Sequence, residues 1–127
     1  MYHRKKDYLM NLLEQLIKHM SLLIDKQPED PLQTRKALEN SFTFYKDNFD
    51  VQQSDSLKEI LEKLPAIYFI DEYVKLLVLD YNLSGNPKEE NLEKALELVK
   101  YLKDTDKTYS WDREVLEQDI LRLLERK

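Results

Sequence analysis

The chain has 127 residues, of which 25 are Asp or Glu and 20 are Lys or Arg, so its formal net charge is −5. It has no cysteine and a single glycine, which excludes disulfides, thiolate chemistry and the phosphate-binding or nucleophile motifs that need two or more glycines. The acidic balance argues against nucleic acid, which needs a basic patch, and no apolar run is long enough to span a membrane.

The length fits one domain over residues 1–127. The absence of cysteine makes an oxidising compartment unnecessary, and the apolar stretch near the N-terminus lacks the pattern of a signal peptide. The sequence therefore predicts a cytoplasmic protein without a targeting segment, with the cytoplasm of a bacterium as the default.

Two helices are predicted in the N-terminal part of the chain. Apolar residues recur at steps of three and four from residue 8 to residue 24, which predicts a first helix over about 4–26. Asp30 can cap the N-terminus of the next helix, and Pro31 suits its first position, where a missing N–H is harmless. The second helix is predicted over about 31–49.

The middle of the chain predicts a short helix followed by a buried one. Ser56 and Glu59 have the spacing of a capping box, which predicts a helix over about 56–63. Residues 66–83 are apolar on nearly every side, as expected for the central helix of a bundle. Gly85 follows, and we expect it to take the left-handed conformation of a structural turn after that helix.

Two more helices complete the prediction. Asn86 and Pro87 repeat the start signal of the second helix and predict a fifth helix over about 87–103. Ser110 is a candidate N-cap for a last helix over about 110–125. Because these helices leave no segment for a sheet, the predicted fold class is all-α, a compact bundle of about six helices.

Two stretches carry a resemblance to known proteins. Residues 7–16, Asp-Tyr-Leu-Met-Asn-Leu-Leu-Glu-Gln-Leu, resemble the opening of an uncharacterised family of small bacterial all-helical proteins. Residues 73–85, followed by 91–99, resemble helix A, the glycine turn and helix B of a tetratricopeptide (TPR) unit, which that family carries in degenerate form. The resemblance implies TPR-like helical hairpins of the α–α superhelix type, with the pair over about 66–103, and no established activity.

The sequence predicts no catalytic residue, no metal site and no cofactor. Its only histidines, His3 and His19, are sixteen residues apart and lie outside any helical metal-ligand spacing.

Asp80 is the acidic residue with the most unusual position. On a helical wheel of the helix over 66–83, it lies opposite the polar arc formed by Asp71, Glu72, Lys75 and Asn82. This predicts a buried carboxylate, which must be partnered or neutral. It is either a structural hydrogen-bond acceptor or an acid/base or ligand-fixing group beside Tyr73 and Tyr81.

Tyrosines, and apolar residues outside the main apolar face of the first helix, form a predicted interaction surface. Tyrosine suits such a surface because it gives a large contact area at a small entropic cost. Met10 and Leu22 widen the apolar face of the first helix and offer an edge to a second copy. The predicted surface residues are Tyr68, Tyr73, Tyr81, Tyr101, Met10 and Leu22.

These observations favour a non-enzymatic protein-interaction or scaffold module that presents its helix faces to an unidentified protein partner. A first alternative is a small-ligand binder or enzyme centred on Asp80 and the neighbouring tyrosines. A second is a structural homo-oligomer, such as a homodimer.

Overall fold

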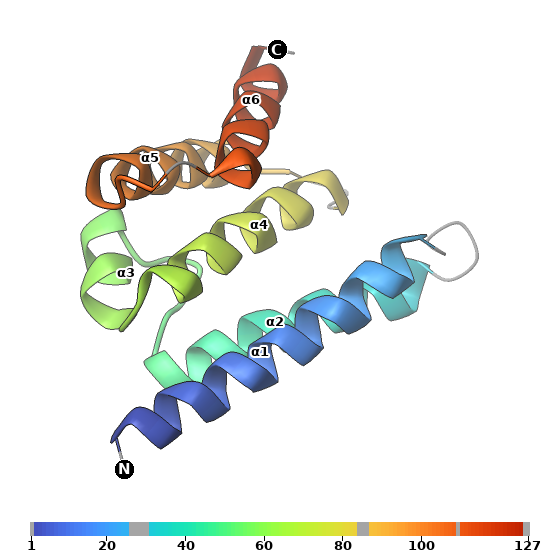
Figure 1. Cartoon of the computed structure of the whole chain (residues 1–127). Coiled ribbons are helices and arrows are strands. Elements are labelled where there is room, and N and C mark those ends of the chain that lie inside the picture. The colour runs from blue at the N-terminus through green and yellow to red at the C-terminus, as the bar shows by residue number, and fades with distance from the viewer. Residues whose placement is uncertain (1, 26–30, 84–86, 109, 126–127) are drawn as a thin grey trace. The chain divides into compact units, whose positions relative to one another are not determined.

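A computed structural model describes residues 2–25, 31–83, 87–108 and 110–125. Within these ranges the chain forms six α-helices and no β-strand, which confirms the predicted all-α class (Figure 1). The helices are α1 (Tyr2–Asp25), α2 (Pro31–Phe49), α3 (Leu57–Lys63), α4 (Ile67–Leu83), α5 (Glu89–Thr105) and α6 (Trp111–Glu125). They fall into two compact units, Met1–Gln52 and Gln53–Lys127, and a single domain over the whole chain stays a prediction.

The first unit is a pair of antiparallel helices, α1 and α2, that lie side by side (Figure 1). Leu13 of α1 and Leu38 and Tyr45 of α2 are fully buried, as the apolar spacing of both helices requires. Beyond the end of α2, Asp50 takes a positive φ of 59°, and its N–H donates to the carbonyl of Lys46 at 3.0 Å. Aspartate tolerates this left-handed conformation better than most residues, so it can end the helix without a glycine.

The second unit begins with the predicted capping box. The Ser56 hydroxyl accepts a hydrogen bond from the Glu59 N–H at 3.2 Å, and Glu59 Oε1 accepts one from the Ser56 N–H at 3.0 Å. These bonds satisfy two backbone donors that the helix itself leaves unpaired, so α3 begins at Leu57.

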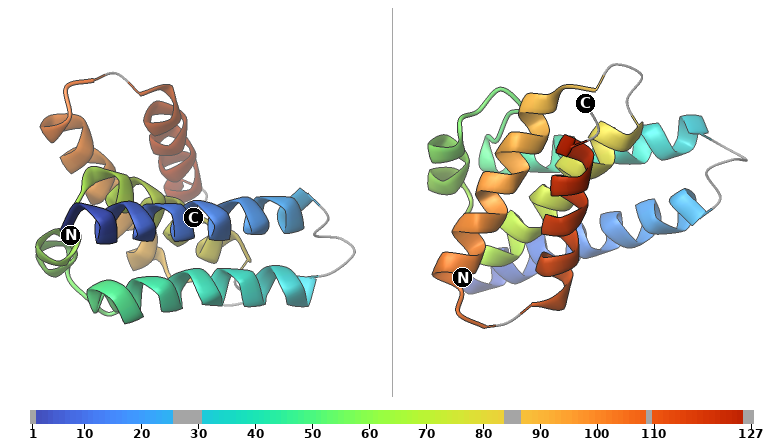
Figure 2. Two further views of the ribbon diagram at one scale, coloured as in Figure 1. Left: turned by 60° about the horizontal axis from the view of Figure 1, so that its bottom comes forward. Right: turned by 90° about the horizontal axis from the view of Figure 1, so that it is seen from above.

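Helix α4 is the most buried element of the second unit, as its apolar sequence predicts. It packs against α5, and α6 packs against α5 and also contacts α4. Figure 2 shows α5 and α6 side by side in its right-hand view. The fully buried side chains of these helices include Phe69, Val74, Leu76, Leu92, Leu98 and Ile120.

The start of α5 differs from the prediction. Pro87 does not occupy the first helical position, because the backbone at Lys88 is still extended (φ −106°, ψ 119°) and helical geometry begins at Glu89. Lys88 is the N-cap, without a side-chain capping bond. Asn86 and the predicted turn residue Gly85 lie outside the described residues.

Ser110 is the N-cap that the sequence predicts for α6. Its hydroxyl accepts a hydrogen bond from the Arg113 N–H at 3.3 Å, and its carbonyl accepts one from the Glu114 N–H at 3.2 Å. This cap fixes the first turn of α6, which carries the side chains described below.

Candidate functional site

The predicted surface tyrosines do not form one surface. Tyr73 is only 1% exposed, so it is a core residue and cannot present its ring to a partner. Tyr68 and Tyr81 are half-buried and lie thirteen residues apart on α4, about 20 Å along the helix axis and on different faces. Tyr101 is exposed on α5. The tyrosine-based set is therefore divided between the core and separate surfaces.

Of the two apolar residues predicted to widen the face of α1, the structure describes the side chain of one. Met10 is half-buried, so part of its side chain remains at the surface. The side chain of Leu22 lies outside the described residues.

Asp80 is half-buried rather than fully buried. Its charge acts on Tyr73: burial of the ring is the main cause that raises the pKa of this hydroxyl, and the carboxylates of Asp55 and Asp80 add to it. Asp80 lines none of the surface hollows described below.

One part of the polar arc of α4, at Asp71, binds a buried arginine of α6. Arg113 is 7% exposed and binds Asp71 through two bonds, from Nε to Oδ1 at 2.8 Å and from Nη2 to Oδ2 at 2.7 Å. Its Nη1 donates to Asp106 Oδ2 at 3.0 Å, in the connector between α5 and α6. The bonds to Asp71 and Asp106 raise the pKa of the guanidinium, so Arg113 stays charged and ties α6 to α4.

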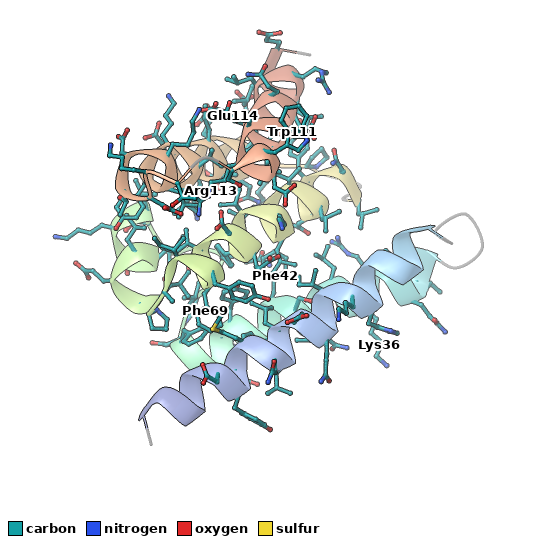
Figure 3. The ribbon with its side chains drawn as sticks, viewed as in Figure 1. Lys36, Phe42, Phe69, Trp111, Arg113 and Glu114 are labelled. Atoms are coloured by element: carbon teal, nitrogen blue, oxygen red, sulfur yellow. The ribbon has the colours of Figure 1, made fainter. Side chains whose placement is uncertain are left out.

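A second ion-pair cluster joins α6 to α5. Lys103 Nζ lies 2.8 Å from Glu114 Oε1 and 2.9 Å from Glu117 Oε1. Figure 3 shows Glu114 and Arg113 on neighbouring positions of the first turns of α6. The two clusters therefore fix both the position and the rotation of this helix, and with them the direction in which its remaining side chains point.

Glu72 is one of two buried carboxylates among the described residues of this unit, at 9% exposure; the other, Asp55, is 7% exposed and pairs with Lys63 at 2.7 Å. Glu72 Oε1 accepts a bond from Lys75 Nζ at 3.3 Å, whereas no described donor reaches Oε2. Burial raises the pKa of this carboxyl, against the effect of Lys75, and the charges of Asp71 and Asp112 raise it further.

A shallow, open depression lies on the surface between α4 and α6. Two adjoining hollows of about 340 and 180 Å³ share Lys75, Asp112 and Leu116 in their walls. We call this feature the α4–α6 groove; α4 also contributes Tyr68 and Glu72 to it, and α6 contributes Trp111, Val115 and Asp119.

Trp111 and Val115 form an exposed apolar edge of this groove. Trp111 is 68% exposed and Val115 is 40% exposed. The two residues are one helical turn apart, so their side chains lie on the same side of α6. Figure 3 shows Trp111 on a different side of the first turn from Arg113. The Arg113 side chain of α6 is therefore buried, whereas the Trp111 side chain faces solvent.

The sequence contains a signal for this exposed edge that the prediction of a helix over about 110–125 did not use. At about 100° per residue, Trp111 and Val115 are separated by about 40°, whereas Ile120 lies about 140° or more from either. Ile120 is fully buried. Trp111 and Val115 therefore lie on the side of α6 opposite the buried Ile120.

None of the clusters of histidine and acidic side chains in the described part of the chain has three members placed to hold a metal ion. No helix in the described ranges combines the length and apolar character needed to cross a membrane. Comparisons of the chain with models of protein families, with characterised proteins and with solved structures gave no match.

Proposed function

We propose that this chain is a non-enzymatic interaction module that binds a partner protein in the α4–α6 groove. The observation that carries the proposal is the exposure of Trp111, the only tryptophan of the chain, at the edge of a groove. Tryptophan is among the residues most enriched at the energetic centres of protein interfaces, because its large ring contributes much buried area.

The surroundings of Trp111 have the composition of an interface centre with a polar rim. Val115 and Leu116 extend the apolar surface, and Asp112 and Asp119 border it. Apolar anchors of this kind supply affinity, whereas the charges at the rim decide which partners are tolerated.

The resemblance of the pair over about 66–103 to a TPR unit belongs to the same proposal. In the structure α4 packs against α5, and α6 packs against α5 in turn. Successive packing of neighbouring helices is how repeat proteins build an extended binding surface. We place this activity in the cytoplasm of a bacterium, as the lack of cysteine favours.

The test is affinity capture with the full chain and two matched variants, Trp111→Ala and Tyr8→Ala. Both remove one exposed aromatic side chain, since Tyr8 is 62% exposed on α1, but only Trp111 borders the groove. We expect Trp111→Ala to weaken binding of the captured protein by about 30-fold or more, as at an interface hot spot. Tyr8→Ala should leave it unchanged.

Circular dichroism of both variants should match that of the parent chain, because neither side chain is part of the core. Equal recovery of the partner by the parent and Trp111→Ala would show that this groove is not the docking surface. Failure of the parent chain to retain any protein would also count against the proposal.

A further inference from the structure

We propose that the α4–α6 groove takes a partner segment in which a lysine or arginine stands next to a large apolar side chain. This inference rests on the proposed function and specifies the chemistry of the partner. It follows from three features of the groove: an excess of carboxylates, cations that already have partners, and an exposed indole ring beside an acidic residue.

The walls of the groove carry more negative than positive charge. They contain four carboxylates and two cations, a formal charge of −2. The carboxylates are Asp71, Glu72, Asp112 and Asp119, and the cations are Lys75 and Arg113.

Both cations are engaged within the chain. Arg113 is held by Asp71 at 2.7 Å and by Asp106 at 3.0 Å, and Lys75 Nζ lies 3.3 Å from Glu72 Oε1. A partner carboxylate would have to compete with these existing pairs. An acidic segment is therefore disfavoured on this surface.

Two of the carboxylates are available to a partner. Asp112 is exposed, and it makes no ion pair with a described cationic side chain. Asp119 pairs with Arg122 at 3.0 Å, but the side chains are 44% and 63% exposed, so this pair is weak and exchangeable. A cation in the groove would gain acceptors without breaking a buried bond.

Trp111 adds a reason for a cation together with an apolar neighbour. It directly precedes Asp112 on α6, and both residues line the same hollow. A guanidinium or ammonium group is attracted to the face of an indole ring. Val115 and Leu116, in the walls of the same hollow, offer a surface that an adjacent apolar side chain can cover.

The test starts from a display library of random peptides selected on the full chain, with counter-selection on Trp111→Ala. The surviving peptides are then titrated while the fluorescence of Trp111, the only tryptophan of the chain, is recorded. We expect enrichment of Lys or Arg beside Leu, Ile, Phe or Trp, and affinity that falls as salt is added.

Two substitutions separate the cation contact from general docking. Replacement of the peptide's Lys or Arg by Gln should weaken binding by about fivefold, the effect of one exposed charge pair. Asp112→Asn should weaken binding of the original peptide to the same extent and leave the Gln peptide unaffected. Asp104→Asn, which removes an exposed carboxylate of α5 outside the groove, is the matched control and should change nothing.

The outcomes distinguish this inference from the function on which it rests. Selected peptides that need Trp111 but are acidic or uncharged would overturn the cationic partner and leave the docking groove intact. The cationic partner would also be overturned, and the docking groove kept, if no peptide survives counter-selection while capture of the protein partner depends on Trp111. A Trp111 signal that changes with protein concentration alone would also overturn the inference, because the occupant would then be a second copy of the chain.

Discussion

Two opposing effects act on the pKa of the Glu72 carboxyl. Burial in α4 disfavours its charged form, and Lys75 is the one described cation that binds it. The neighbouring carboxylates, Asp71 on the same helix and Asp112 on α6, act in the same direction as burial. We therefore infer that the charge of Glu72 lowers the stability of the folded chain at neutral pH.

This leads to a prediction for Glu72→Gln. The pKa of this carboxyl in the folded chain lies above its ordinary value of 4.5, so the folded state binds more protons than the unfolded state between the two values. Stability contributed by this position is thus lost as the pH rises through that window. Glu72→Gln should increase the free energy of unfolding at about pH 7 and have little effect below pH 4.5.

Urea unfolding followed by the fluorescence of Trp111 measures this difference. Glu93→Gln, at an exposed position of α5, is the matched control and should leave the free energy of unfolding unchanged at either pH. If Glu72→Gln instead lowers stability at neutral pH, the ion pair with Lys75 outweighs the effect of burial.

Glu72 and Asp80 also show where residue-level reasoning from the sequence reaches its limit. A helical wheel assigns Glu72 to a polar arc and Asp80 to the opposite side of the same helix. In the structure Glu72 is buried and its neighbour Asp71 pairs with the buried Arg113 of α6, whereas Asp80 is only half-buried. The amphipathic pattern of one helix cannot reveal that another helix places a complementary charge against part of its polar face.

At the scale of elements, Arg113 holds α6 in place. It joins α6 to Asp71 of α4 and to Asp106 in the connector that follows α5. We expect Arg113→Ala to lower the free energy of unfolding by about 3 kcal/mol, since the two carboxylates lose their common partner. The effect lies at the lower end of the range for buried pairs, because both carboxylates are partly exposed to water.

Arg122→Ala is the matched control on the same helix. The Arg122 side chain is largely exposed and, among the described residues, its ion pair is with Asp119, so its loss should change stability by less than about 1 kcal/mol. Equal effects of the two substitutions in urea unfolding would contradict the assignment of Arg113 as the anchor of α6.

The start of α3 gives an independent prediction at the same scale. Ser56→Ala removes the acceptor for the Glu59 N–H and should cost about 1 kcal/mol, the usual effect of losing an N-cap. The hydrogen bonds with Ser56 lower the pKa of the Glu59 carboxyl below its ordinary value of 4.5. The contribution of this carboxylate to the stability of the folded chain is therefore fully present above pH 4.5 and is lost as the pH falls through the lowered pKa.

Ser54→Ala is the control for the cap, since Ser54 is exposed and precedes the helix without forming the capping box. Thermal unfolding of both variants at neutral and acidic pH measures the difference. A Ser56→Ala variant as stable as Ser54→Ala at neutral pH would show that the capping box contributes nothing to the stability of the folded chain.

At the scale of the whole molecule, local signals in the sequence predict the helices well. Apolar periodicity predicts α1, the apolar character of nearly every side of residues 66–83 predicts α4, Pro31 marks the start of α2, and the Ser56 box marks the start of α3. Each of these signals acts within a few residues of the chain, so it can be recognised without knowledge of the tertiary structure.

The candidate site could be predicted only in part, because it depends on how separate helices meet. The tyrosines chosen from the sequence include Tyr73, which is a core residue. The groove instead depends on α6, whose rotation is fixed by Arg113 and Lys103 through partners on other elements. The helical spacing that puts Trp111 and Val115 opposite Ile120 was a local clue to the exposed Trp111.

The central claim is that a partner protein covers Trp111 in the α4–α6 groove, and acrylamide quenching of its fluorescence tests this most directly. Trp111 is the only tryptophan of the chain, so a tryptophan-free form of the captured partner leaves a single reporter at the proposed interface. Because the free side chain is 68% exposed, we predict efficient quenching of the chain alone and a marked loss of quenching in the complex. Equal quenching in the free and bound states would contradict the account.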